Sequence, residues 1–172
     1  IAAITGTAQL AETVMGERAF PAYQGGKIIT QHQVAAIWDG LDLADPEAVK
    51  RFIAECIRLY PPVSSTCRVA TEPFAAVING AARHFPAGTR ILVGMGMAMV
   101  DEAHWGPTVF EFDHARPRLL EDMMGFNGVG DEGPRVCPGR FLVMDTLVKA
   151  LQLIGQVRRG LVGSPQREKA CC

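Results

Sequence analysis

The chain has 172 residues, of which 48% are hydrophobic and 20% charged, so it is long enough for one domain and apolar enough to bury a core. A formal net charge of -1 provides no broad basic surface, which argues against nucleic acid as a partner. The longest apolar run, residues 91–100, is too short to cross a bilayer.

The amino-terminal segment predicts two modest helices. The first covers residues 7–19, and Pro21, Gly25 and Gly26 interrupt the chain after it. The second is expected over residues 31–41. Because the sequence begins on Ile1 without a methionine or a signal pattern, we expect either processing or a missing upstream part.

Residues 45–62 give the clearest helix prediction. Asp45 is a suitable N-cap, Pro46 suits the first helical position, and Pro61 and Pro62 end the helix. One apolar stripe is expected from the helical spacing of Val49, Phe52, Ile53, Cys56, Ile57 and Tyr60. Cys56 is therefore interpreted as a small core residue.

Glu55 and Arg58 lie three positions apart on this helix, on the side away from the apolar stripe. Residues at this spacing are neighbours on a helix surface. Taken alone, the spacing predicts a solvated ion pair.

A β-rich segment follows the helix. Residues 74–85 alternate around Asn79-Gly80, the dipeptide preferred in type I′ hairpins, and residues 90–100 predict a strand that passes into a helix. Residues 101–139 then form a loop of nearly forty residues without strong periodicity, which indicates a functional segment or one organised by a non-protein group.

The last predicted helix covers residues 140–155 and ends at Gly155. Its apolar face is expected to contain Phe141, Met144, Leu147, Val148 and Leu151.

The stretch GVGDEGPRVCPGR, residues 128–140, supports two interpretations. Gly128, Gly130 and Gly133 spell the G-x-G-x-x-G of a dinucleotide-binding turn, which requires a strand before it and a helix directly after it. A long loop precedes these glycines and prolines follow them, so we interpret this match as accidental.

Cys137 is the stronger candidate in this stretch. It immediately precedes a predicted helix, whose positive end stabilises a thiolate, and Arg135 adds a cation nearby. A nucleophilic cysteine needs a base, and the four histidines show no pairing motif. A metal ligand needs none, because the metal deprotonates the thiol. The five cysteines also lack metal-finger spacing, which predicts reduced thiols in an intracellular compartment.

Four motifs in a consistent order carry a resemblance to a known family. The segment GPRVCPG has the form G-x-R-x-C-x-G, and ECIRLYPPV has the form E-x-x-R followed by two prolines. Between these two lie CRVATEP with VINGAARHFPAGTRILV, and then HWGPTVFEFDHAR. From about Ala48 to Gly155 the chain resembles the carboxyl-terminal, heme-binding part of a cytochrome P450. This resemblance implies a mainly α fold with a small β region, the carboxyl-terminal half of a P450-like fold.

The resemblance also implies a cofactor and its binding residues. The cofactor is heme b, with the Cys137 thiolate as axial ligand of the iron. Arg135 and Arg68 would pair with the heme propionates. The implied cofactor-binding residues are Arg68, Phe126, Gly133, Arg135 and Gly139, and the implied buried charge triad is Glu55, Arg58 and Arg116.

The chain departs from the family pattern at several positions. Gly130 occupies the place of the family's phenylalanine, and Phe126 lies further back. Met99 and His114 replace a histidine and a proline of the family pattern. The insertion GVGD resembles the glycine-rich extension of peroxygenase-type members.

The family's oxygen-activating helix should precede the E-x-x-R helix, where Thr5 and Thr7 are weak candidates for its catalytic threonine. We therefore predict remnant helices over 1–44, a P450-like heme-binding region over 45–160 and a flexible tail over 161–172.

Two functions follow from the resemblance. One is a heme-thiolate monooxygenase, or peroxygenase-type enzyme, that oxidises an apolar organic substrate with a redox partner or peroxide. The other is a P450-derived accessory subunit without catalysis, in which other protein chains cover the missing distal half. The location is predicted to be intracellular, with membrane or organelle association only through an upstream part or partner subunits.

Overall fold

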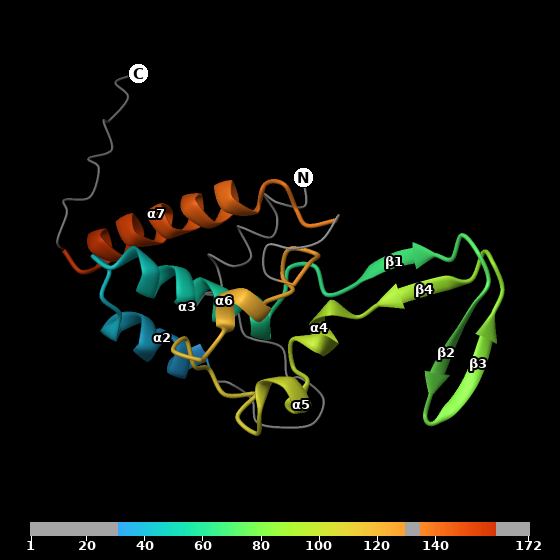
Figure 1. Cartoon of the computed structure of the whole chain (residues 1–172). Coiled ribbons are helices and arrows are strands. Elements are labelled where there is room, and N and C mark those ends of the chain that lie inside the picture. Colours follow the sequence, from blue (N-terminus) through green and yellow to red (C-terminus); the bar gives the residue numbers. More distant parts are fainter. Residues whose placement is uncertain (1–30, 130–134, 161–172) are drawn as a thin grey trace, which may run out of the picture.

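A helical body and an extended arm of short strands make up the described chain (Figure 1). The computed structural model describes residues 31–129 and 135–160. The predicted helix over 7–19 lies outside these residues, as do Thr5, Thr7 and Gly133. The proposed division into three regions stays a prediction. Within the described ranges, no helix combines the length and the apolar character needed to cross a membrane.

Helix α3 (Pro46–Leu59) lies at the centre of the helical body. The Asp45 carboxylate accepts a hydrogen bond of 2.9 Å from the Glu47 N–H, and Tyr60 caps the other end ahead of the two prolines. Both predicted boundaries are confirmed. From Phe52 to Leu59 every side chain is buried, so α3 is enclosed on all sides and not only along its apolar stripe.

Cys56 lies in this enclosed part of α3 and is fully buried, as predicted for a core residue. Burial raises the pKa of its thiol well above the ordinary value, with the neighbouring Glu55 carboxylate as a smaller cause.

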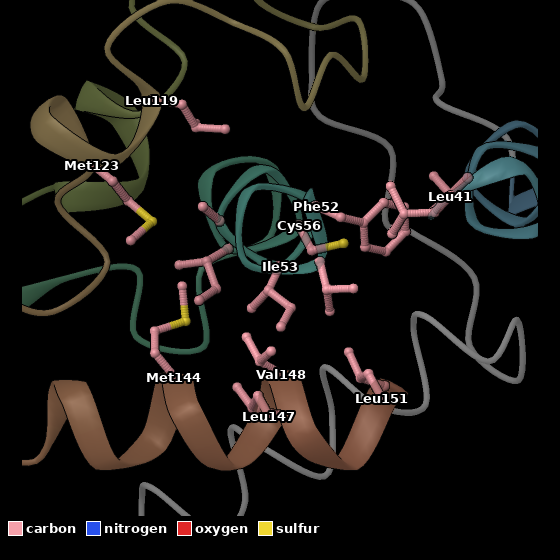
Figure 2. Packing of buried hydrophobic residues seen from close by; sticks show 14 of the residues in the cluster. Leu41, Phe52, Ile53, Cys56, Leu119, Met123, Met144, Leu147, Val148 and Leu151 are labelled. Atoms are coloured by element: carbon pink, nitrogen blue, oxygen red, sulfur yellow. The ribbon is translucent and has the colours of Figure 1, made fainter. Parts of the chain in front are cut away.

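Helices α2 (Gln31–Gly40) and α7 (Arg140–Arg158) accompany α3 in the helical body. Figure 2 shows Leu147, Val148 and Leu151 pointing from α7 toward α3, where Ile53 meets them. The predicted second helix is confirmed by α2.

Helix α7 begins at Arg140 as predicted, but it differs from the prediction in where it ends and in one residue of its buried face. Gly155 does not end it, because the helix continues to Arg158. A Cβ at Gly155 would lie 2.5 Å from Leu43 Cδ1, so the glycine permits close helix packing. At the other end Phe141 is 57% exposed and its ring lies against the Arg140 guanidinium, so its predicted place on the buried face is wrong.

Two antiparallel strand pairs form the arm. Strand β1 (Thr66–Val69) pairs with β4 (Arg90–Val93), and β2 (Phe74–Ile78) pairs with β3 (Ala81–Phe85). Asn79 and Gly80 connect β2 to β3 with φ values of 52° and 77°. Positive φ at both central residues is the signature of the predicted type I′ turn, which is therefore confirmed.

Three short helices follow the arm: α4 (Met95–Ala98), α5 (Glu102–Trp105) and α6 (Leu119–Asp122). The predicted passage from strand to helix is confirmed by β4 and α4. Leu119 and Met123 carry the α6 segment onto the core around α3 (Figure 2).

Candidate heme-thiolate site

Cys137 is held by its backbone at the start of α7. Its N–H donates to the Phe126 carbonyl at 2.9 Å, which closes the loop between these two residues. Its carbonyl accepts from the Arg140 N–H at 3.2 Å and from Arg140 Nη1 at 3.3 Å. The side chain is half-buried. The backbone therefore fixes a cysteine whose side chain is only partly buried.

Gly139 lies beside the Cys137 sulfur and places no side chain there. A Cβ added at Gly139 would lie 3.9 Å from Sγ, an ordinary contact distance, and would approach no other described atom within 4 Å. The partly buried Cys137 lies three residues ahead of a 19-residue helix. These features fit an iron-bound thiolate.

Arg68 connects β1 to the cysteine loop. Its Nη2 donates to Asn127 Oδ1 at 3.2 Å, and its Nη1 donates to the Cys67 carbonyl at 3.1 Å and to Thr66 Oγ1. Arg135 is exposed, and its carbonyl accepts from Asn127 Nδ2 at 2.8 Å. The structure thus brings Arg68, Arg135 and Cys137 to one loop.

Behind this loop, Arg58 is fully buried and makes a bidentate ion pair with Glu55. Its Nε and Nη2 donate to the two carboxylate oxygens at 2.7 and 2.9 Å. It also donates to the carbonyls of Met99 at 2.8 Å and Val109 at 2.7 Å. The solvated ion pair that spacing alone predicts is wrong, because other segments enclose both side chains.

Arg116 completes a charge cluster around the Glu55 carboxylate. Its Nε lies 3.6 Å from Glu55 Oε1, too far for a hydrogen bond, and has no other hydrogen-bond partner among the described residues. Glu55 Oε1 instead accepts from the Asp113 N–H at 3.0 Å. Two guanidiniums and one amide therefore surround one buried carboxylate, which offsets part of the cost of burying it.

The same arginines organise much of the long loop predicted over 101–139. Arg116 donates to the carbonyls of Trp105, Thr108 and Glu111 at 2.9 to 3.1 Å. Arginine side chains thus satisfy several backbone carbonyls between residues 105 and 111.

Sequence reasoning did not identify Arg51 and Asn127 as parts of the site. Arg51 donates to the carbonyls of His114 and Arg116 and so ties α3 to the segment that carries Arg116. A signal existed, since Arg51, Glu55 and Arg58 share one helix face at i, i+4 and i+7. For Asn127 the signal was its place between Phe126 and a glycine, because asparagine tolerates left-handed backbone.

Comparisons with known proteins agree on one family. A family model described as Cytochrome P450 matches residues 31–154. Cytochrome P450 71A23 of Arabidopsis thaliana is 34% identical over 106 residues, covering 57% of this chain and 20% of that protein. The chain spans about one fifth of the length of this curated relative.

Solved structures share the fold. The P450 heme domain of Tepidiphilus thermophilus superposes with a TM-score of 0.64 at 20% identity, covering 88% of this chain and 31% of that one. An intact type IV self-sufficient cytochrome P450 monooxygenase gives a TM-score of 0.62 at 23% identity, covering 87% and 16%. The expected fold, mainly α with a small β region and part of a P450, is therefore confirmed.

Proteins of this family bind heme b through a cysteine thiolate and act in general as monooxygenases supplied with electrons by redox partners. The family model matches well over half of the sequence, from α2 to near the end of α7. This chain belongs to the cytochrome P450 family.

Proposed function

We propose that this chain supplies the heme-thiolate part of a cytochrome P450 monooxygenase, with Cys137 as the axial ligand of heme b. The observation that carries the proposal is the position of Cys137. Its backbone is hydrogen-bonded to Phe126 ahead of α7, its side chain is only partly buried, and the neighbouring Gly139 has no side chain.

The residues around Cys137 are suited to hold the cofactor. Arg68 brings its guanidinium to the loop and Arg135 is an exposed residue of the loop, and each would form charge-assisted hydrogen bonds with a propionate. Gly139 leaves room beside the sulfur, and Phe126 fixes the cysteine through its carbonyl. When bound, the heme supplies oxygen insertion into an apolar substrate, and a thiolate ligand favours O–O cleavage.

The buried charge cluster of Glu55, Arg58 and Arg116 supports this role by holding the segment that precedes the loop. Arg58 and Arg116 hold residues 99–116 against α3 through backbone carbonyls. Met124, next to the core residue Met123, donates its N–H to the sulfur of Met99, so the segment leading to Phe126 rests on the same framework. A rigid support of this kind maintains the ligand position when the cofactor is absent.

Substrate, electron source and distal pocket are finer parts of the proposal. The substrate is an apolar organic molecule, and the oxidant is oxygen with a redox partner or peroxide. The distal half comes from residues or chains beyond those that match here. An intracellular location stays a prediction from the cysteine pattern.

A second candidate function is a non-catalytic accessory subunit derived from a P450. It is favoured by the exposed apolar side chains near the proposed site, since Leu92 on β4 is 72% exposed and Leu142 on α7 is 73% exposed. Such side chains are usually covered by a partner or a ligand. Heme and distal helices would cover them in the first candidate, and partner chains in the second.

An absorption spectrum decides between the two candidates. The purified chain is mixed with hemin, freed of excess cofactor, and measured oxidised and then reduced under carbon monoxide. A Soret band with the red-shifted carbonyl band of thiolate ligation is expected. Cys137→Ala should abolish the red-shifted band, whereas Cys67→Ala, which removes an exposed thiol on β1, should leave it unchanged.

The opposite results are equally informative. A chain that takes up no heme, although circular dichroism shows it folded, would refute the heme-thiolate proposal and favour the accessory subunit. A red-shifted band that survives in Cys137→Ala would assign the ligand to another residue.

A further inference from the structure

Asn127 uses both ends of one side-chain amide at the proposed heme site. Its Oδ1 accepts from Arg68 Nη2 at 3.2 Å, and its Nδ2 donates to the Arg135 carbonyl at 2.8 Å. A guanidinium can only donate and a carbonyl can only accept. The chemistry of the two partners therefore determines the amide orientation unambiguously.

The backbone of Asn127 is equally specific. Its φ of 65° lies in the left-handed region, and its N–H donates to the Met124 carbonyl at 3.2 Å in a tight turn. Asparagine and glycine adopt this conformation more readily than other residues. The preceding carbonyl, that of Phe126, accepts the Cys137 N–H. A change in the backbone of Asn127 would therefore move the carbonyl that holds the Cys137 N–H.

Two neighbouring hydrogen bonds join the two ends of this loop. The Phe126–Cys137 backbone hydrogen bond is one, and the Asn127–Arg135 side-chain hydrogen bond is the other. The Arg68 contact then attaches the closed loop to β1, a segment nearly sixty positions earlier in the sequence. Asn127 therefore links β1, which carries the proposed propionate donor Arg68, to the loop that carries the proposed iron ligand Cys137.

We propose that Asn127 is a positioning residue that couples Arg68 to the Cys137 loop and so determines how firmly the thiolate is presented to heme iron. The part of this inference that concerns heme iron rests on the proposed heme-thiolate function. Its structural part concerns only residues of this chain. Asn127 acts through Arg68, Arg135 and Cys137, and no contact of its own with heme is assumed.

Two substitutions separate the backbone of Asn127 from its side chain. Asn127→Gly keeps the left-handed conformation and removes both side-chain hydrogen bonds. Asn127→Asp keeps the acceptor for Arg68 and replaces the donor to Arg135 by an oxygen. Asn79, with a φ of 52° in the distant β2–β3 hairpin, provides the matched controls Asn79→Gly and Asn79→Asp.

The first measurement needs no cofactor. Amide hydrogen exchange at Cys137 is followed by mass spectrometry or NMR in the heme-free chain. Losing one hydrogen bond of the Asn127 side chain is expected to speed exchange of the Cys137 N–H about fivefold, given the net contribution of a typical hydrogen bond to stability. We expect this in both Asn127 variants and in neither Asn79 variant. Unchanged exchange in Asn127→Gly, or an equal change in Asn79→Gly, would overturn the inference.

The second measurement uses the heme-loaded chain reduced under carbon monoxide. Both Asn127 variants should convert part of the red-shifted thiolate band into the blue-shifted band of a weakened or lost thiolate, while the Asn79 variants keep the native ratio. A native ratio in both Asn127 variants would overturn the coupling to the ligand. A wild-type chain that binds no heme would refute the proposed function alone, because the exchange measurement still decides whether Asn127 holds the loop.

Discussion

Replacing Arg58 by methionine would remove the guanidinium that joins three separate parts of the chain. Arg58 makes two hydrogen bonds to Glu55 and one each to the carbonyls of Met99 and Val109. Its guanidinium carbon also lies 5.2 Å from the centre of the Trp105 ring. Methionine fills part of the volume but can donate none of these bonds.

The cost of Arg58→Met follows from what remains behind. The Glu55 carboxylate, itself fully buried, would keep only the Asp113 amide and the Arg116 guanidinium 3.6 Å away. Breaking a buried ion pair by removing one partner costs about 3–5 kcal/mol. Natural domains have a free energy of unfolding of about 5–15 kcal/mol. The variant should therefore lose a large fraction of its stability.

Urea denaturation at neutral pH, followed by far-ultraviolet circular dichroism, measures this loss. Lys50→Gln is a matched control, because Lys50 pairs with Glu47 at the same i, i+3 spacing on the same helix but is 42% exposed. Exposed pairs contribute about 0–1 kcal/mol, so the control should unfold close to wild type. If Arg58→Met changed the free energy of unfolding no more than Lys50→Gln does, the buried charge cluster would not be a major source of stability.

Two further predictions concern packing and pH. Gly125→Ala places a Cβ 2.3 Å from Ile57 Cγ2 and should lower the free energy of unfolding by about 1–3 kcal/mol in the same denaturation assay. Gly40→Ala is the control, because a Cβ there meets no atom within 4 Å, and it should not lower stability. Equal effects of the two substitutions would contradict the packing argument. Burial raises the pKa of the Cys56 thiol in the folded state, so the protonated thiol favours folding. This contribution to the free energy of unfolding is fully present below the thiol pKa of the unfolded chain and is lost as pH rises toward the pKa of the folded chain. Unfolding midpoints should fall on the alkaline side of about pH 9, and Cys56→Ala should flatten this fall; an unchanged slope would show that other groups cause it.

Local sequence signals predicted local structure well. Asp45 and the two prolines determined where α3 begins and ends, because capping and proline geometry depend on neighbouring residues alone. The Asn79-Gly80 dipeptide predicted its turn for the same reason. The motif around Cys137 indicated heme-thiolate chemistry before any contact was known, since a family pattern combines residue type with order along the chain.

Predictions failed where a distant segment decides the outcome. Gly155 resembles a helix end in the sequence, yet it lies inside α7, where Leu43 approaches it too closely for a Cβ. Phe141 has the spacing of a core residue, but it faces outward with Arg140 against its ring. Helical periodicity places a residue on a face and does not say what covers that face.

The sequence by itself determined the boundaries of α3, the hairpin, the family and the candidate ligand. Spacing alone could not show that Glu55 and Arg58 are buried, since an i, i+3 pair has the same spacing on a surface as in a core. The family resemblance implied a buried charge triad, and the tertiary structure shows which segments enclose it. It also revealed the contacts of Asn127, whose partner Arg68 lies on another element. Spacing along the chain encodes local geometry, whereas burial and hydrogen-bond partners depend on segments brought together by packing over long sequence separations.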